Sequence, residues 1–274
     1  MLDSFPERWA LVTGASSGIG AAFARKLASL GMHVALSAPH RDPLEKLAAD
    51  LRTNCGIRTL VVACDLTEQD QAKVLIDHLK DSNVCLELLV NNAGFGVLGG
   101  PTNVSAASIL KMLRLNVSAL TELTYLVLPE MMARQHGAII NVSSLSAFQP
   151  VAYMAAYAAS KAYVLHFTEA LWAETQRTGV TVTAVCPGYT RTAFWKSAGV
   201  PDCFTGHPQQ VPEQVVEAAL KALRKRLPYV VSGWRNYLLS LGPRIVSRQL
   251  VVSQTAKFTK QIHSAVPPEN HRHF

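Results

Sequence analysis

Two residues that could move a proton lie one helical turn apart in an otherwise apolar stretch. The segment AAYAASKAYVLHF (155–167) has the composition of a buried helix, yet it carries Tyr157 and Lys161. Residues at i and i+4 lie on one helix face, so the phenol and the ammonium point the same way. A fixed cation favours the phenolate, so the spacing predicts a tyrosine whose pKa of about 10 is lowered toward neutrality. Ordinary packing of both side chains is the alternative.

A glycine-rich turn joins the first predicted strand to the first predicted helix. In TGASSGIG (13–20), we expect Gly14 to permit a tight turn, Gly18 to let the backbone approach a pyrophosphate, and Gly20 to allow close packing. The N-terminus of the helix would offer unpaired N–H groups and a positive dipole end to phosphates. The turn therefore predicts nucleotide binding, and a plain turn is the alternative.

Short apolar runs rich in β-formers alternate with longer helical stretches along the chain. The predicted strands are residues 9–14, 33–37, 57–64, 86–94, 137–144, 180–188 and 229–233. Several are apolar on both faces, as a parallel sheet covered by helices requires. The sequence thus predicts an α/β fold, a doubly wound Rossmann-type parallel sheet of about seven strands with helices on both faces. We expect helices at 18–31, 42–54 (capped by Asp42), 67–81 (capped by Thr67), about 105–134, about 153–178 and about 212–226.

The length of 274 residues and the 49% hydrophobic content suit one catalytic domain, which we place at residues 1–233. A segment rich in Pro and Gly, 190–212, is expected to be a flap over the site. Residues 234–274 are expected to form a basic, amphipathic C-terminal extension. Its apolar stripe favours packing on the core or on a second subunit, in a homodimer or homotetramer, over a membrane surface, and it could also complete the pocket. Its arginines could face an acyl-carrier protein, coenzyme A phosphates or anionic lipid.

The composition limits which partners and which cellular compartment we expect. Residues 221–274 hold ten Lys/Arg and one acid, but these bases sit on no recognisable nucleic-acid module, so we expect no nucleic acid. No cluster suggests a metal. There is no signal-like start, and the cysteines lack CxxC spacing, which predicts reduced thiols in a cytoplasmic protein. The cysteines are Cys55, Cys64, Cys85, Cys186 and Cys203.

Further motifs follow the glycine turn in a fixed order. They are CDLT (64–67), NNAG (91–94), RLNVS (114–118), NVSS (141–144), YAASK (157–161) and PGYTRT (187–192). With the G-x-x-x-G-x-G spacing of the turn, the chain resembles a classical short-chain dehydrogenase/reductase over residues 8–233. It is similar to the branch that holds 3-oxoacyl reductases and hydroxysteroid dehydrogenases.

The resemblance implies a catalytic set of Asn116, Ser144, Tyr157 and Lys161. Tyr157 would be the acid/base, and Lys161 would tune it while binding the nicotinamide ribose hydroxyls. Ser144 would hold the substrate oxygen, with Ser143 as the alternative assignment. Asn116 would loosen its helix and hold a water on the proton path.

The resemblance also implies a nicotinamide dinucleotide along the strand ends, with Thr13 and Asn91 as braces. The implied contacts are Gly14, Ser16, Ser17, Gly18, Ile19, Gly20, His40, Arg41, Asp65, Leu66, Asn92, Ala93, Gly94, Tyr157, Lys161, Pro187, Gly188, Thr190 and Thr192.

The residue that ends the second strand favours NADP over NAD. Ala38 stands where NAD enzymes place a carboxylate for the ribose 2′-hydroxyl. His40 and Arg41 would meet the 2′-phosphate of NADP, with Ser37 or Ser17 donating. Pro39 stands where NADP enzymes usually place an arginine.

The expected mouth of the site is apolar and aromatic, which suits a hydrophobic carbonyl. Its residues are Phe95, Val97, Leu145, Val151, Met154, Tyr189, Phe194 and Trp195. We therefore predict an NADP(H)-dependent oxidoreductase that interconverts a ketone and a secondary alcohol on a 3-oxoacyl, steroid-like or other apolar substrate. The alternative is a non-catalytic nucleotide-binding sensor or interaction protein on the same fold, which would have no use for a tuned phenol.

Overall fold

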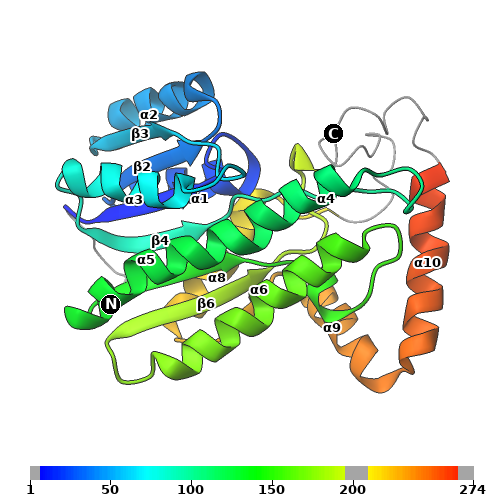
Figure 1. The fold of residues 1–274 in the computed structure, drawn as a ribbon. Helices are drawn as coiled ribbons and strands as arrows, with labels where there is room; N and C mark the ends of the chain where they lie inside the picture. The colour runs from blue at the N-terminus through cyan, green and yellow to red at the C-terminus, as the bar shows by residue number, and fades with distance from the viewer. Residues whose placement is uncertain (1–6, 195–208, 265–274) are drawn as a thin grey trace.

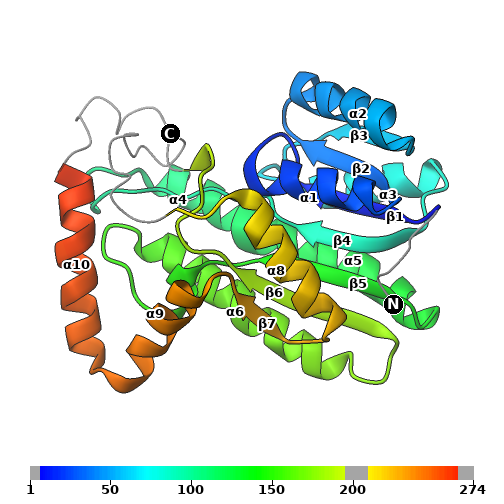
Figure 2. The same cartoon turned by 180° about the vertical axis from the view of Figure 1, so that it is seen from behind.

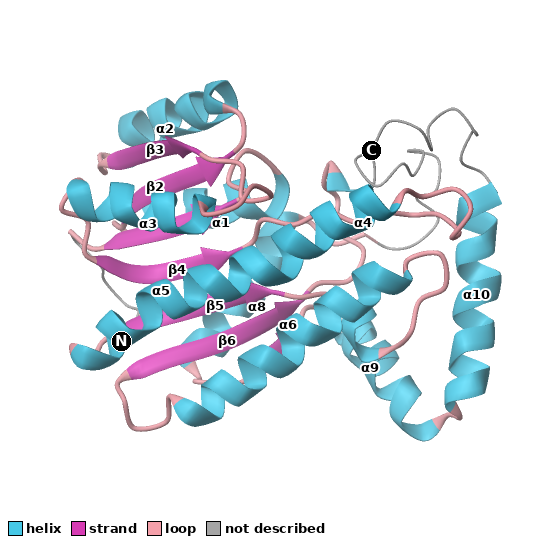
Figure 3. Cartoon of the chain, in the orientation of Figure 1, coloured by secondary structure: helices cyan, strands magenta, loops and turns pink. Residues whose placement is uncertain are grey.

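All seven predicted strands are present and pair in parallel in one sheet (Figures 1 and 3). The computed structural model describes residues 7–194 and 209–264, so most of the predicted flap lies outside the described residues. The sheet order is β3-β2-β1-β4-β5-β6-β7. The strands are β1 (Trp9–Thr13), β2 (His33–Ala38), β3 (Thr59–Ala63), β4 (Leu86–Asn91), β5 (Gly137–Val142), β6 (Val180–Cys186) and β7 (Tyr229–Val231). The predicted α/β fold is confirmed.

Helices cover both faces of this sheet. One face is covered by α1 (Gly18–Ser29), α2 (Arg41–Cys55) and α8 (Pro212–Arg224), as Figure 2 shows. The other is covered by α3 (Gln71–Asp81), α5 (Leu120–Ala133) and α6 (Ala155–Glu174), which lie in front of the strands in Figure 1. Each layer buries its own apolar cluster against the strands, which holds the strand ends, and any site on them, in fixed positions.

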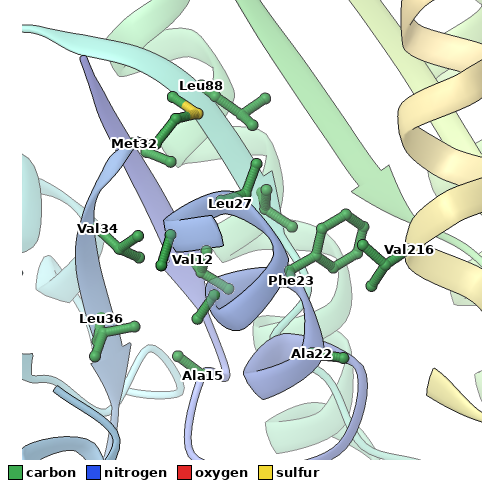
Figure 4. Close-up of a cluster of buried hydrophobic side chains, with 14 of the residues drawn as sticks. Val12, Ala15, Ala22, Phe23, Leu27, Met32, Val34, Leu36, Leu88 and Val216 are labelled. Atoms are coloured by element: carbon green, nitrogen blue, oxygen red, sulfur yellow. The ribbon is translucent and has the colours of Figure 1, made fainter. Parts of the chain in front are cut away.

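The helix that follows the glycine turn is anchored by Phe23. Phe23 and Leu27 lie one turn apart on the buried face of α1, and neither side chain is more than 1% exposed. They pack among Met32, which precedes β2, Leu88 of β4 and Val216 of α8 (Figure 4). This contact fixes the N-terminus of α1 at the end of β1.

Two helices begin at residues other than those predicted. Helix α2 has His40 at its N-cap, with Asp42 inside the first turn, and α3 begins at Gln71 instead of near Thr67. The reason at Thr67 is a competing turn. The backbone N–H and the hydroxyl of Thr67 both donate to the Asp65 carboxylate, at 3.0 and 2.7 Å, which holds residues 65–68 outside the helix.

The predicted long helix at 105–134 is interrupted at the position of Asn116. It consists of α4 (Ala106–Leu113), a π-helical segment η1 (Arg114–Ala119) and α5. The expectation that Asn116 loosens its helix is thus met. Such π-helical turns are rare, and they often accompany functional sites.

The chain continues past β7 into two further helices. These are α9 (Trp234–Ile245) and α10 (Arg248–Ser264), which form a V-shaped arm beside the carboxyl ends of the strands (Figures 1 and 2). Within residues 7–194 and 209–264, no helix is both long and apolar enough to cross a bilayer.

Replacing Phe23 by Ala should destabilise the fold by about 3–5 kcal/mol, because the cavity left under α1 cannot be refilled by its close-packed neighbours. Urea unfolding followed by circular dichroism measures this. Val74→Ala on α3, where the side chain is 53% exposed, should change the free energy of unfolding by less than about 0.5 kcal/mol. Equal effects of the two changes would contradict the anchoring role of Phe23.

Candidate active site

A cleft of about 1610 Å³ runs along the carboxyl ends of the strands, from the glycine turn to the C-terminal arm. It spans the point where the strand order reverses between β1 and β4, which is where open α/β sheets bind ligands. Its wall includes every predicted cofactor contact except Gly20 and Arg41. Three of the four predicted catalytic residues, Ser144, Tyr157 and Lys161, also line it.

Close backbone contacts shape the glycine turn. Gly14 has φ +63°, a conformation that residues with a Cβ rarely adopt. A Cβ on Gly20 would lie 2.2 Å from the carbonyl oxygen of Gly14. Gly20 is therefore buried under the turn, where it permits close packing of α1, and does not face the cleft.

The turn is tied to the end of β4 by Thr13. Its hydroxyl oxygen accepts hydrogen bonds from the backbone N–H groups of Asn92 and Ala93, both at 3.0 Å. The side-chain amide of Asn92 donates back to the Thr13 carbonyl at 2.9 Å. These bonds fix the width of the cleft between β1 and β4.

The phenol of Tyr157 lies beside Ser144. Tyr157 comes from the first turn of α6, and Ser144 follows β5; the Ser144 hydroxyl is close enough to the phenol to act on its pKa. The Ser144 hydroxyl oxygen also accepts from the N–H of Ser146 at 3.1 Å. Ser143, the alternative, is engaged elsewhere, because its hydroxyl donates to the Lys161 carbonyl at 2.7 Å. These contacts favour Ser144.

Lys161 is buried beneath the same phenol. Its ammonium donates to the carbonyl of Val142 at 2.9 Å and lies 6.0 Å from the centroid of the Tyr157 ring. Burial lowers the pKa of Lys161 to about 8. Burial also raises the pKa of Tyr157 to about 12, although the neighbouring Ser144 hydroxyl acts against this rise. The lowered tyrosine pKa predicted from the spacing is therefore wrong for this structure, because desolvation of the phenol outweighs the lowering effect of Ser144.

Asn116 lies behind the cleft and positions its wall. Its amide donates to the Phe95 carbonyl at 3.0 Å and to the Ser160 hydroxyl at 3.2 Å, and its oxygen accepts from the Phe95 N–H at 3.2 Å. A Cβ on Gly94 would lie 2.9 Å from the Asn116 oxygen and 3.4 Å from the Lys161 nitrogen. The chain at Gly94 thus passes closely between Asn116 and Lys161.

Of the residues predicted to contact the cofactor at the end of β2, some line the cleft and one does not. Ala38, Pro39 and His40 line the cleft, whereas Arg41 forms an exposed ion pair with Glu45 at 3.0 Å and does not line it.

The hydroxyl of Ser37 also lies in the cleft wall at the end of β2. It is buried and has no hydrogen-bond partner among the described residues. Asp65 lines the cleft as well, with one carboxylate oxygen held by Thr67.

The substrate end of the cleft is apolar, as predicted. Six predicted residues line it: Phe95, Leu145, Val151, Met154, Tyr189 and Phe194. Val97 is buried but does not line it, and Trp195 lies outside the described residues.

The arm contributes to this end of the cleft, which is one of the interpretations of its apolar stripe, although its individual residues were not predicted. Its lining residues include Asn236, Leu239, Val246, Leu250, Val251, Gln254, Thr255, Phe258 and Thr259.

Asn236 is the most informative of these. Its amide donates to the Ser232 carbonyl at 2.7 Å, and a Cβ on Gly188 would lie 2.4 Å from it, so it packs directly on the loop after β6. The sequence could have indicated Asn236 by its position, because GWRN (233–236) comes soon after the carboxyl end of β7 and ligands bind at the carboxyl ends of parallel strands.

The residues present fit a nicotinamide dinucleotide. The N-terminus of α1 opens on the cleft, and the side chain of its N-cap residue, Ser17, makes no capping bond and can serve a ligand. The unpartnered Ser37 hydroxyl lies further along the same wall. In residues 7–194 and 209–264, no group of three or more His, Cys, Asp or Glu could hold a metal ion.

The family model of the short chain dehydrogenases matches residues 8–200. The chain belongs to this family of oxidoreductases. Very-long-chain 3-oxoacyl-CoA reductase of Anas platyrhynchos is 32% identical over 82% of this chain and 74% of that protein. 17-beta-hydroxysteroid dehydrogenase type 3 of Danio rerio is 32% identical over 84% of this chain and 72% of that protein.

Solved structures share the fold over nearly the whole chain. A short-chain dehydrogenase from Sphingobium yanoikuyae in complex with NADPH has a TM-score of 0.78 and 30% identity, covering 95% of this chain and 96% of that chain. A short-chain dehydrogenase/reductase from Burkholderia phymatum in complex with NAD has a TM-score of 0.77 and 25% identity, covering 88% and 93%. Both dinucleotides therefore occur among proteins of this fold.

The buried ammonium predicts a pH-dependent stability. The pKa of Lys161 falls from 10.5 to about 8 on folding, so the folded protein binds this proton less tightly than the unfolded chain. The free energy of unfolding of Lys161→Met, minus that of the wild type, should therefore be on the order of 3 kcal/mol larger below pH 8 than above pH 10.5. Urea unfolding of both proteins from pH 7 to 10.5 measures this, and a difference that does not change with pH would contradict it.

Proposed function

We propose that the protein is an NADP(H)-dependent oxidoreductase that interconverts a ketone and a secondary alcohol on a hydrophobic substrate. One observation carries the proposal. Tyr157, close to the Ser144 hydroxyl and above the buried Lys161, lines the same cleft as the glycine turn. A phenol, a second hydroxyl and a cation around one point are what proton transfer to a carbonyl oxygen requires.

When bound, the nicotinamide ring supplies or accepts the hydride. In the reductive direction, Tyr157 donates its proton to the carbonyl oxygen, and the hydroxyl of Ser144 holds that oxygen by a hydrogen bond. The Lys161 ammonium then stabilises the phenolate and binds the ribose hydroxyls. Asn116 keeps the neighbouring backbone at Phe95 in place.

The cofactor would lie along the described wall of the cleft. The N–H groups at the start of α1 bind the pyrophosphate, since this helix end carries a positive partial charge. Ser37, Ser17 and His40 bind the 2′-phosphate, and Pro187, Gly188, Thr190 and Thr192 line the nicotinamide end. Ala38 leaves the end of β2 without a carboxylate, so a 2′-phosphate meets no like charge there.

The substrate class follows from the apolar wall. Phe95, Val151, Met154 and Phe194 offer no charge to a substrate, and α10 adds Phe258. Such a wall favours 3-oxoacyl, steroid-like or other bulky apolar carbonyls over sugars. The two relatives named for 3-oxoacyl-CoA and hydroxysteroid chemistry support this class.

Tyr157→Phe should lower turnover by about 10²–10⁴-fold, because the proton donor is lost, while NADPH binding stays close to wild type. NADPH oxidation with a panel of 3-oxoacyl thioesters, steroid ketones and bulky aryl ketones measures turnover, and NADPH fluorescence measures binding. Tyr163→Phe is the matched control, the same change on the same helix at a tyrosine that is 40% exposed. Retained activity of Tyr157→Phe would refute the mechanism, and a wild type inactive on the whole panel would favour the sensor alternative.

His40→Ala should weaken NADPH binding about tenfold and leave NADH binding unchanged, because only the 2′-phosphate meets this side chain. Ala38→Asp should reverse the preference toward NADH, since its carboxylate repels the 2′-phosphate and accepts from the 2′-hydroxyl. Arg41→Ala is the control, because Arg41 is paired with Glu45 outside the cleft wall. Tighter binding of NADH than NADPH by the wild type would overturn the proposed cofactor.

A further inference from the structure

The C-terminal arm, residues 234–264, carries a concentration of exposed apolar side chains. Fourteen large hydrophobic side chains are exposed in the described parts of the chain, and eight of them belong to this arm. Single exposed apolar residues are normal on a protein surface, whereas a cluster marks an interaction surface. The eight are Trp234, Tyr237, Leu238, Leu239, Ile245, Val246, Leu250 and Val252.

Helix α9 turns its apolar face away from the protein. Trp234, Leu238 and Ile245 follow each other at i, i+4 and i+11, which places them on one face, and they are 69%, 56% and 87% exposed. The opposite face holds Asn236, which bonds to the Ser232 carbonyl, and Ser240, which is only 4% exposed. A surface helix in water has the reverse arrangement, so the outer face of α9 is built to meet an apolar medium.

The charge of the arm indicates which medium this is. Residues 234–264 include five cations and no Asp or Glu. A second copy of the chain, docked arm to arm, would bring these like charges together, whereas an anionic lipid surface would attract them. The cations are Arg235, Arg244, Arg248, Lys257 and Lys260.

The exposed apolar face is continuous with the cleft. Leu239, Val246 and Leu250 are exposed and also line the cleft. Helix α10 is held as the outer wall of the cleft, because the Thr255 hydroxyl donates to the Pro150 carbonyl at 3.1 Å. The V of the two helices in Figures 1 and 2 therefore stands at the substrate end of the site.

We propose that this arm docks the protein on an anionic lipid surface. The outer face of α9 lies at the boundary between headgroups and acyl chains, and the cations of the arm meet the anionic headgroups. Docking in this way would open the substrate end of the cleft toward the lipid. An apolar carbonyl dissolved in the bilayer would then enter directly, a consequence that rests on the proposed function.

Sedimentation of the full-length protein with vesicles tests the docking. In roughly 0.1 M salt the protein should pellet with phosphatidylcholine vesicles that contain phosphatidylglycerol, and less with phosphatidylcholine alone. The triple variant Trp234→Ser, Leu238→Ser, Ile245→Ser should lose about tenfold in vesicle affinity for each apolar side chain removed. Arg248→Glu with Lys257→Glu should lose roughly fivefold or more per cation.

A control variant and a binding measurement separate loss of vesicle binding from misfolding and from loss of activity. Val74→Ser removes an exposed apolar side chain from α3 and should bind vesicles as the wild type does. None of the five arm residues changed lines the cleft, so all variants should bind NADPH equally. Absence of pelleting by the wild type, or equal pelleting by the triple variant, would overturn the proposal. So would a wild-type oligomer in lipid-free solution that the triple variant converts to monomer, because a second copy would then cover the face.

Discussion

The hydrogen bond from the Lys161 ammonium to the Val142 carbonyl is the contact on which the site depends. It joins α6 to the last residue of β5, and it is buried, with Lys161 only 5% exposed. Burying an ammonium against one carbonyl is unfavourable, which is why its pKa falls. The fold nevertheless holds it there, and in doing so it fixes Tyr157, one turn earlier on α6, against Ser144, two residues beyond Val142. The site therefore contains a charge whose burial is destabilising, and the proposed function gives a reason for keeping it.

A chain of buried polar side chains carries this placement across the sheet. The Asn91 amide donates to Asn141, its neighbour on β5, at 3.0 Å, and Asn141 donates to the Thr168 hydroxyl on α6 at 2.9 Å. Beside it, Thr13 ties the glycine turn to β4. These bonds link β4, β5 and α6, and Thr13 adds the glycine turn through the backbone next to Asn91, so a shift of α6 would reach both ends of the cleft. The Asn91 side-chain oxygen is buried without a hydrogen-bond partner among the described residues, so the bonds that fix this side chain are those donated by its amide.

The sheet and the pairing of Tyr157 with Lys161 could be predicted from sequence because each depends on short-range pattern, whereas Asn116 and Ser144 were implied by the family resemblance alone. Apolar runs indicate the strands, and the helical spacing of Tyr157 and Lys161 indicates that the two side chains share one face. The direction in which the Tyr157 pKa shifts could not be predicted, because it depends on burial of the phenol by residues that are distant in the sequence. Arg41 was misplaced because its partner Glu45 lies one turn along the same helix, a choice that spacing leaves open. The pocket residues of the arm could not be predicted one by one, because the spacing of its apolar stripe does not show which face of α9 meets the body; the structure shows that Asn236 and Ser240 do.

A difference titration of tyrosinate absorbance tests the central claim most directly. The spectrum of the wild type minus that of Tyr157→Phe isolates one phenol, and it is followed with rising pH, with and without NADP⁺. The account predicts that without NADP⁺ this phenol ionises only near its raised pKa of about 12, and at lower pH once the positive nicotinamide ring joins Lys161 beside it. A phenol that ionises near pH 10 without NADP⁺, as a solvent-exposed tyrosine does, and does not respond to the cofactor would contradict the account.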